Sequence, residues 1–134
     1  MTKKLEMYRC SICGNIAQVL KEGSGNLVCC GQEMELLVPQ YEENELGEKH
    51  VPVIETESEG CETGMCKRAT KVKIKQHPMI QEHYIDFIEV YTKDKKEVRL
   101  KFFSPGEKPI LDITDFYYDV NSLEYCNIHG LWRG

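Results

Sequence analysis

The stretch YIDFIEVYT, residues 84–92, decides the fold of most of this chain, because β-branched and aromatic side chains fill it. Two further stretches, TKVKIK (70–75) and EVRLKFF (97–103), alternate apolar with basic residues, which is the period-two pattern of a strand. Turn sequences such as TKDKK (92–96) and SPGEKP (104–109) separate these strands at short spacing, and no helical period is evident. The pattern predicts an all-β fold, an immunoglobulin-like antiparallel β-sandwich of about seven strands.

Composition places the chain among globular proteins of ordinary size. Its 134 residues are 41% hydrophobic and 29% charged, and no apolar run is long enough to span a bilayer. The start, MTKKLEMYRC (1–10), lacks the apolar core of a secretion signal. We therefore expect a cytoplasmic protein with no membrane partner. The net charge of -5 and the lack of a basic patch also argue against a nucleic-acid partner.

Charge and cysteine usage divide the chain into two predicted domains, 1–38 and 39–134. The first carries four basic and four acidic residues, and the second carries 13 basic and 18 acidic residues. The acidic run YEENELGEK (41–49) reads as a solvated linker near the start of the second. A domain of about 38 residues is too small to be stable through its core alone, so a bound metal is expected to stabilise it.

Four cysteines in the first domain have the spacing of a metal site. Cys10 and Cys13 form a C-x-x-C turn, and after fifteen intervening residues Cys29 and Cys30 are adjacent. A hairpin that brings the second pair over the turn would surround one tetrahedral ion with four sulfurs. Seven cysteines in a reducing compartment favour metal over disulfides, and the spacing alone suits zinc and iron equally.

All four histidines fall in the second domain, and each lies at a predicted strand end or in a loop. His50 opens the strand HVPVIE, His77 and His83 flank HPMIQEHY, and His129 shares the C-x-x-H turn CNIHG with Cys126. A lone histidine is usually an ordinary surface or core side chain, so the argument is collective. Four imidazoles and one thiolate make five ligands, which suits an iron site with one open position better than a closed four-ligand zinc site.

Five motifs, in order along nearly the whole chain, make this sequence resemble desulfoferrodoxin, the two-iron form of superoxide reductase. They are YRCSICGNI (8–16), LVCCGQEM (27–34), EKHVPVIE (48–55), HPMIQEHYI (77–85) and EYCNIHGLW (124–132). The resemblance implies a small desulforedoxin- or rubredoxin-like metal-binding module followed by the β-sandwich. It also implies two iron ions per chain. Nothing in the sequence predicts calcium or another structural ion.

The resemblance assigns ligands to both irons. The first iron takes four sulfurs, from Cys10, Cys13, Cys29 and Cys30. The second takes four equatorial nitrogens and one axial sulfur, from His50, His77, His83, His129 and Cys126. It further implies one-electron reduction of superoxide to hydrogen peroxide at the second iron, an electron donor such as rubredoxin, and a homodimer.

Residues around the second site have expected roles in this reaction. We expect the backbone amides of Ile128 and His129 to donate to the Cys126 sulfur and temper its electron donation. Lys49 would attract the superoxide anion to an otherwise acidic protein. Glu48 would bind the iron in its oxidised state, because a carboxylate is a harder ligand than imidazole.

Cys61 and Cys66 belong to neither predicted iron site. They lie in ETESEGCETGMCKRAT (55–70), which is longer than the hairpin usual in the family. They could be free thiols, a labile disulfide, ligands of an extra metal or a redox sensor, and we favour the first two.

Two other classes of function would use only part of this pattern. A rubredoxin-like electron carrier or a zinc-stabilised binding module needs the first four cysteines but not the gathered histidines. A superoxide dismutase would use the same redox iron, but it would release oxygen and need no reductant.

Overall fold

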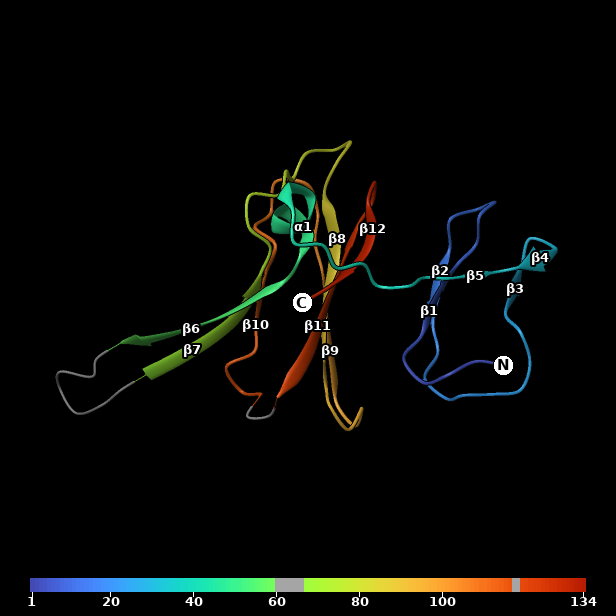
Figure 1. The fold of residues 1–134 in the computed structure, drawn as a ribbon, viewed down its shortest axis with the longest axis horizontal. Coiled ribbons are helices and arrows are strands. Elements are labelled where there is room, and N and C mark those ends of the chain that lie inside the picture. Colours follow the sequence, from blue (N-terminus) through green and yellow to red (C-terminus); the bar gives the residue numbers. More distant parts are fainter. Residues whose placement is uncertain (60–66, 117–118) are drawn as a thin grey trace. The chain divides into compact units, whose positions relative to one another are not determined.

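The computed structural model describes residues 1–59, 67–116 and 119–134. The chain divides into two compact units, Met1–Val38 and Pro39–Gly134 (Figure 1). Both units are built almost entirely from β-strands, which confirms the predicted fold class. Within the described residues, no helix has the length and apolar character needed to cross a membrane.

The first unit is a three-stranded antiparallel sheet with a short hairpin beside it in sequence. Strand β1 (Met7–Arg9) lies between β2 (Ile16–Gln18) and β5 (Glu35–Leu36). Strands β3 (Val28–Cys29) and β4 (Gln32–Glu33) form the hairpin.

The apolar interior of this unit is small. Its buried apolar side chains, among the described residues, are Leu5, Met7, Cys10 and Val19. So few buried groups contribute little hydrophobic stabilisation, which agrees with the expectation of a metal-stabilised module.

The second unit is a sandwich of seven strands in two antiparallel sheets, as predicted. One sheet has the order β10-β7-β6, formed by Ile110–Asp112, Lys67–Lys73 and Val53–Glu59. The other has the order β12-β11-β8-β9, formed by Gly130–Arg133, Val120–Cys126, Ile85–Thr92 and Val98–Phe102.

The core between these sheets is apolar and holds one of the predicted metal ligands. Its buried members are Val72, Ile74, Ile85, Ile88, Val90, Phe103, Leu111, Ile113 and Cys126. The strand β8, which the opening sequence stretch predicted, supplies three of them. A ligand embedded in such a core is held rigidly, because close-packed interiors leave side chains little freedom.

Strand β9 shows the predicted alternation, but its apolar face is the exposed one. Val98, Leu100 and Phe102 are 41%, 40% and 67% exposed. On the opposite face the Arg99 guanidinium lies 4.7 Å from the centre of the Phe116 ring. The basic side chains of this strand therefore cover the edge of the sandwich.

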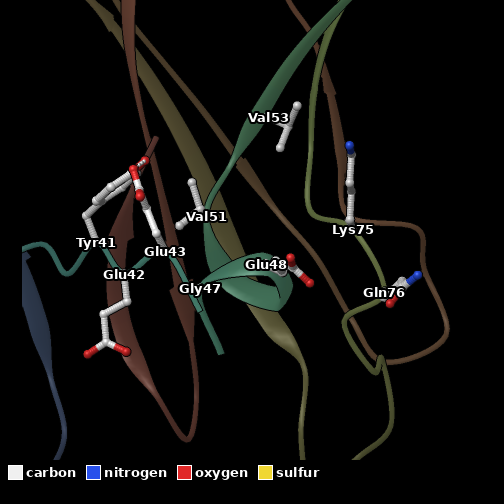
Figure 2. A pocket seen from close by; sticks show the side chains of 9 residues that line it. All are labelled: Tyr41, Glu42, Glu43, Gly47, Glu48, Val51, Val53, Lys75 and Gln76. Carbon is white, nitrogen blue, oxygen red and sulfur yellow. Dashed lines mark hydrogen bonds between the residues drawn. The ribbon is translucent and has the colours of Figure 1, made fainter. Parts of the chain in front are cut away.

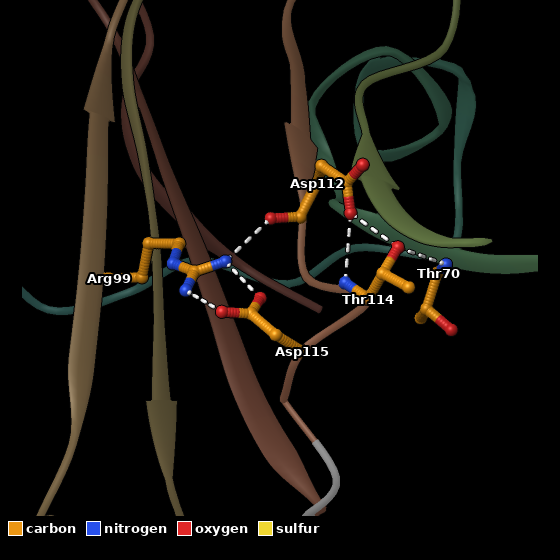
Figure 3. A network of polar contacts seen from close by, with 5 residues as sticks. All are labelled: Thr70, Arg99, Asp112, Thr114 and Asp115. Carbon is orange, nitrogen blue, oxygen red and sulfur yellow. Dashed lines mark hydrogen bonds and ion pairs between the residues drawn. The ribbon is translucent and has the colours of Figure 1, made fainter. Parts of the chain in front are cut away.

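Arg99 also ties the two sheets together (Figure 3). Its two terminal nitrogens each donate to one oxygen of Asp115 at 2.6 Å, and Nη1 also donates to the backbone carbonyl of Asp112 at 3.0 Å. The Asp112 carboxylate accepts from Thr114, whose hydroxyl in turn accepts from the Thr70 amide. One guanidinium on β9 thus fixes the turn that leaves β10.

Two expectations for the start of the second unit are wrong. The acidic run is not only a linker, because Glu45–His50 forms helix α1, and His50 ends this helix instead of opening a strand. The Asn44 side chain caps the helix by accepting from the Gly47 amide at 3.0 Å. Gly47 is required there because a Cβ would collide with the preceding backbone. Six residues are too few to produce a recognisable helical period.

We predict that the Arg99–Asp115 pair stabilises the sandwich as one unit. Arg99→Lys and Asp115→Asn should each lower the midpoint of urea-induced unfolding slightly, because lysine cannot form two parallel hydrogen bonds to a carboxylate. The urea midpoint of the double variant should be no lower than that of the less stable single variant, because either single substitution already breaks the ion pair. Lys108→Met, outside this network, is the control, and additive losses would contradict the prediction.

Candidate metal centres

The four cysteines of the first unit form one cluster, as the spacing predicted. Their sulfur atoms all lie within 4.8 Å of one another. The Cys29 sulfur lies 3.5 Å from that of Cys13 and 3.9 Å from that of Cys30. Four sulfurs this close, with none joined in a disulfide among the described cysteines, match the ligand set of a tetrahedral metal site.

The adjacent pair reaches a common point because the backbone reverses at Cys30. Cys30 has a φ of 52° and Gly31 a φ of 76°, which places both in the left-handed region between β3 and β4. On the other side of the cluster, Gly14 has a φ of 81° and its amide donates to the Cys10 carbonyl at 2.9 Å. A non-glycine residue with positive φ is uncommon and often marks a functional site.

The thiols of this cluster ionise unequally. Hydrogen bonds from the backbone amides of Cys13 and Ile12 lower the pKa of Cys10 to about 6. Hydrogen bonding with Cys13, and then with Cys29, raises the pKa of Cys30 to about 12. Without a cation, four adjacent thiolates repel one another, so a bound metal is needed for all four to be ionised together.

The four histidines of the second unit form a closed ring of imidazoles. Neighbouring ring centres around this circuit are 4.6–5.0 Å apart, in the order His50, His77, His83, His129. Neighbouring planes meet at 60–84°, whereas the diagonal pair His50 and His83 is 6.3 Å apart. The four rings therefore outline a rough square, and all four could hold one metal ion between them.

Two of these rings have a defined tautomer. Nδ1 of His50 lies 2.7 Å from the Leu46 carbonyl oxygen, and Nδ1 of His77 lies 2.6 Å from that of Pro78. Because a carbonyl only accepts, each Nδ1 carries the proton and each Nε2 keeps a free lone pair. The Nε2 atoms of both rings and of His83 are buried without a hydrogen-bond partner. Such orphaned acceptors are what a metal ion would satisfy.

Burial favours the neutral form of three of these rings. Burial lowers the pKa of His50 and His83, and it lowers the pKa of His77 to about 4. A neutral imidazole is the form that binds metals.

Cys126 completes this cluster with a buried sulfur. The Cys126 sulfur lies 3.7 Å from Nδ1 of His129, and the ligand atoms of His50, His83, Cys126 and His129 all lie within 4.8 Å of one another. His77 falls outside that limit, although its ring packs directly against those of His50 and His83.

The backbone amides near Cys126 act on its sulfur, which confirms that prediction. The His129 amide donates to the Cys126 sulfur at 3.4 Å. Burial raises the pKa of Cys126, whereas the amides of His129 and Ile128 lower it. Burial also raises the pKa of Glu124 to about 9, and the negative charge of this carboxyl, when it ionises, adds to the rise of the Cys126 pKa.

Glu48 and Lys49 lie on the helix that carries His50, but they form no hydrogen bond or ion pair with the imidazoles in the described structure. Glu48 is exposed and lines a pocket of about 460 Å³ with Lys75 and Gln76 (Figure 2). Lys49 forms an ion pair of 3.5 Å with Glu45. Its charge still reaches the cluster, because it contributes to the lowered pKa of His50.

Sequence reasoning missed two residues that support the cluster. The Trp132 indole stacks on His50 at 4.9 Å, and its Nε1 donates to the His129 carbonyl at 3.1 Å. The Gln40 side chain donates to the same carbonyl at 2.8 Å. The single tryptophan of the chain, three residues after the C-x-x-H turn, was the available signal for the first, and nothing in the sequence signalled the second. Cys61 and Cys66 lie outside the described residues.

We predict that the metal-free protein loses stability in acid through His77. The folded pKa is about 4 and the ordinary value is 6.5, so only the unfolded chain binds a proton between these values. Stability is therefore unaffected above pH 6.5 and falls as the pH drops toward 4. Urea unfolding at pH 7.5 and 4.5 measures this loss. The free energy of unfolding should fall between these pH values by on the order of 2 kcal/mol more in wild type than in His77→Gln. Equal losses would contradict this.

The chain matches known proteins over both units. The family model described as Desulfoferrodoxin matches residues 42–134, and that described as Desulfoferrodoxin, N-terminal domain, matches residues 2–37. A desulfoferrodoxin homolog of Archaeoglobus fulgidus is 43% identical over 134 residues, which cover 99% of this chain and 98% of that one. A superoxide reductase of Pyrococcus furiosus is 35% identical over 115 residues, with 65% of this chain and 86% of that one covered.

A solved structure supports the fold. The superoxide reductase from Treponema pallidum covers 100% of this chain and 99% of its own, with a TM-score of 0.68 at 22% identity. The four-cysteine cluster and the histidine–cysteine cluster match the two-iron arrangement that the sequence predicted. From the family matches over both units, the chain belongs to the desulfoferrodoxin family.

Proposed function

We propose that this protein is a superoxide reductase. One superoxide anion, one electron and two protons would yield one hydrogen peroxide at the second centre. The observation that carries the proposal is the square of four imidazoles beside a buried thiol, in which three ring nitrogens have no partner. A carrier or a zinc module would need only the four-cysteine cluster, so neither accounts for this second arrangement.

The proposed ligands follow from this geometry. The second iron would take nitrogens of His50, His77, His83 and His129 and the sulfur of Cys126. The first iron would take the sulfurs of Cys10, Cys13, Cys29 and Cys30. When bound, the second iron in its ferrous form would supply the electron that superoxide receives.

The surroundings of Cys126 would set how much electron density its sulfur donates to a bound iron. Burial favours strong donation, because no water competes for the sulfur lone pairs. The hydrogen bond from the His129 amide withdraws part of that charge. The balance should favour release of peroxide over cleavage of its O–O bond.

Lys49 would attract the substrate and hold protons near the product. The protein has a net charge of -5, so its average field repels superoxide. The Lys49 ammonium acts on His50 and is partly exposed, which leaves it accessible to a small anion. Its Nζ can also order the solvent that protonates the departing peroxide.

Glu48 would serve the oxidised centre. Its carboxylate lies in the pocket beside helix α1, so the proposed role requires it to turn toward the imidazoles. An electron donor such as rubredoxin and a homodimer belong to this proposal as well. The first centre would either relay electrons from that donor or serve a structural or dimer-forming role. The relatives named superoxide reductase support the proposed reaction.

The yield of products tests the proposal. With an electron donor present, iron-loaded protein should form one peroxide for each superoxide consumed and should release no oxygen beyond spontaneous dismutation. Oxygen release without any donor would identify a dismutase instead, and failure to consume superoxide would favour a carrier. Cys126→Ser should abolish the reaction while the visible absorption of the first centre remains.

Removal of the Lys49 charge should slow the encounter with superoxide. We expect Lys49→Met to lower the second-order rate constant about tenfold and to flatten its dependence on ionic strength. Pulse radiolysis at several salt concentrations measures both quantities. Lys75→Met is a matched control, because it removes the same charge from the neighbouring pocket. An unchanged rate and salt slope in Lys49→Met would disprove steering by this residue.

A further inference from the structure

We infer that Asn127 is a positioning residue that holds the backbone around His83 against the Cys126–His129 turn, and thereby sets the geometry of the second metal centre. The inference deepens the proposed function and rests on it, because it assigns His83 to that centre. It concerns an exposed side chain that forms no hydrogen bond with an imidazole ring in the described structure.

His83 depends on its backbone for its position. His50 and His77 are each held by a carbonyl oxygen at Nδ1, and His129 faces the Cys126 sulfur. In the described part of the chain, no oxygen accepts a hydrogen bond from the His83 ring, and its Nε2 is buried without a partner. The ring can therefore reach the common centre only if the peptide groups on either side are fixed.

Two residues fix those peptide groups. Ile80 forms two hydrogen bonds with the backbone of His83, both of 3.1 Å. Asn127 holds the flanking groups: its Oδ1 accepts from the Tyr84 amide at 2.9 Å, and its Nδ2 donates to the Glu82 carbonyl at 3.1 Å. The Asn127 amide also donates to the Tyr84 carbonyl at 3.2 Å.

A side chain is needed here because the strand ladder ends. Strand β8 begins at Ile85, and its pairing with β11 shifts register between Tyr125 and Cys126. The peptide groups of 82–84 therefore lie beyond the regular ladder. A carboxamide presents one donor and one acceptor, as a peptide does, so Asn127 extends the pairing past the shift.

The position suits a test by truncation. Asn127 is exposed, so alanine at this site leaves no cavity in the core. Alanine removes the two side-chain hydrogen bonds and keeps the one from the backbone amide. We expect the backbone around His83 to become mobile in this variant while the sandwich stays folded.

The experiment compares iron-loaded full-length wild type with Asn127→Ala. The chelator concentration that removes iron from the second centre should be at least tenfold lower for the variant than for wild type. Losses of this size are typical when the hydrogen-bond partners of a metal ligand are removed. The ferric absorption band of that centre should also shift, which a loss of stability alone would not cause. The absorption of the first centre, measured in the same sample, should stay unchanged.

Asn121→Ala is the matched control. Asn121 lies on β11, the strand that precedes the Cys126–His129 turn, and accepts a hydrogen bond of 2.9 Å from the Lys93 ammonium, away from that turn. Its chelator titration and spectrum should equal those of wild type. If Asn127→Ala also equals wild type in both measurements, the inference is overturned.

Amide hydrogen exchange tests the contact without iron. In metal-free full-length wild type the Tyr84 amide should be protected, and Asn127→Ala should lose that protection. Exchange of the wild-type Tyr84 amide at the rate of an unstructured peptide would overturn the inference. A wild-type chain that binds no second iron would instead overturn the proposed function, and the exchange measurement would still decide whether Asn127 holds this backbone.

Discussion

Three buried imidazole nitrogens without hydrogen-bond partners are the constraint on which the second unit depends. An unsatisfied buried polar atom costs about 1–3 kcal/mol. His50 and His77 are held by backbone carbonyls in the tautomer that points the bare nitrogen inward, so the arrangement is specified by the fold. A cation bound among several such atoms would satisfy them together. The fold thus gathers these bare nitrogens around a common centre.

The sandwich makes this convergence possible, although its core contributes one ligand. Cys126 lies in the apolar core, where close packing holds its sulfur. The histidines come from three connecting segments: the end of helix α1, the residues before β8, and the turn between β11 and β12. Such connecting segments can vary in sequence without disturbing the strands, and binding residues are commonly carried on loops that a rigid scaffold positions.

The first unit reaches stability by a different route. Its apolar interior is small, and its cysteines lie in or beside turns that contain left-handed residues, Gly14, Cys30 and Gly31. Cys30 has a positive φ, a conformation that a non-glycine residue adopts at a cost. A metal bound by four sulfurs would offset that cost and supply the stability that the core lacks. Metal binding and folding are therefore expected to be coupled more tightly here than in the sandwich.

The sequence by itself determined the β-sandwich, the meeting of the four cysteines and the backbone amides that act on Cys126, because alternation and C-x-x-C or C-x-x-H spacing are local patterns. The assignment of the histidines to one iron came from the family resemblance and stays a prediction. It misassigned His50 to a strand, because six residues form a helix only with the Asn44 cap and the tight approach at Gly47. The tertiary structure alone decided the square of imidazoles, the stacking of Trp132 on His50, and the contact of Asn127 with the His83 segment. Most of these contacts join residues far apart in the sequence, such as His50 with Trp132 and Tyr84 with Asn127, and their geometry depends on strand register, which no local pattern records.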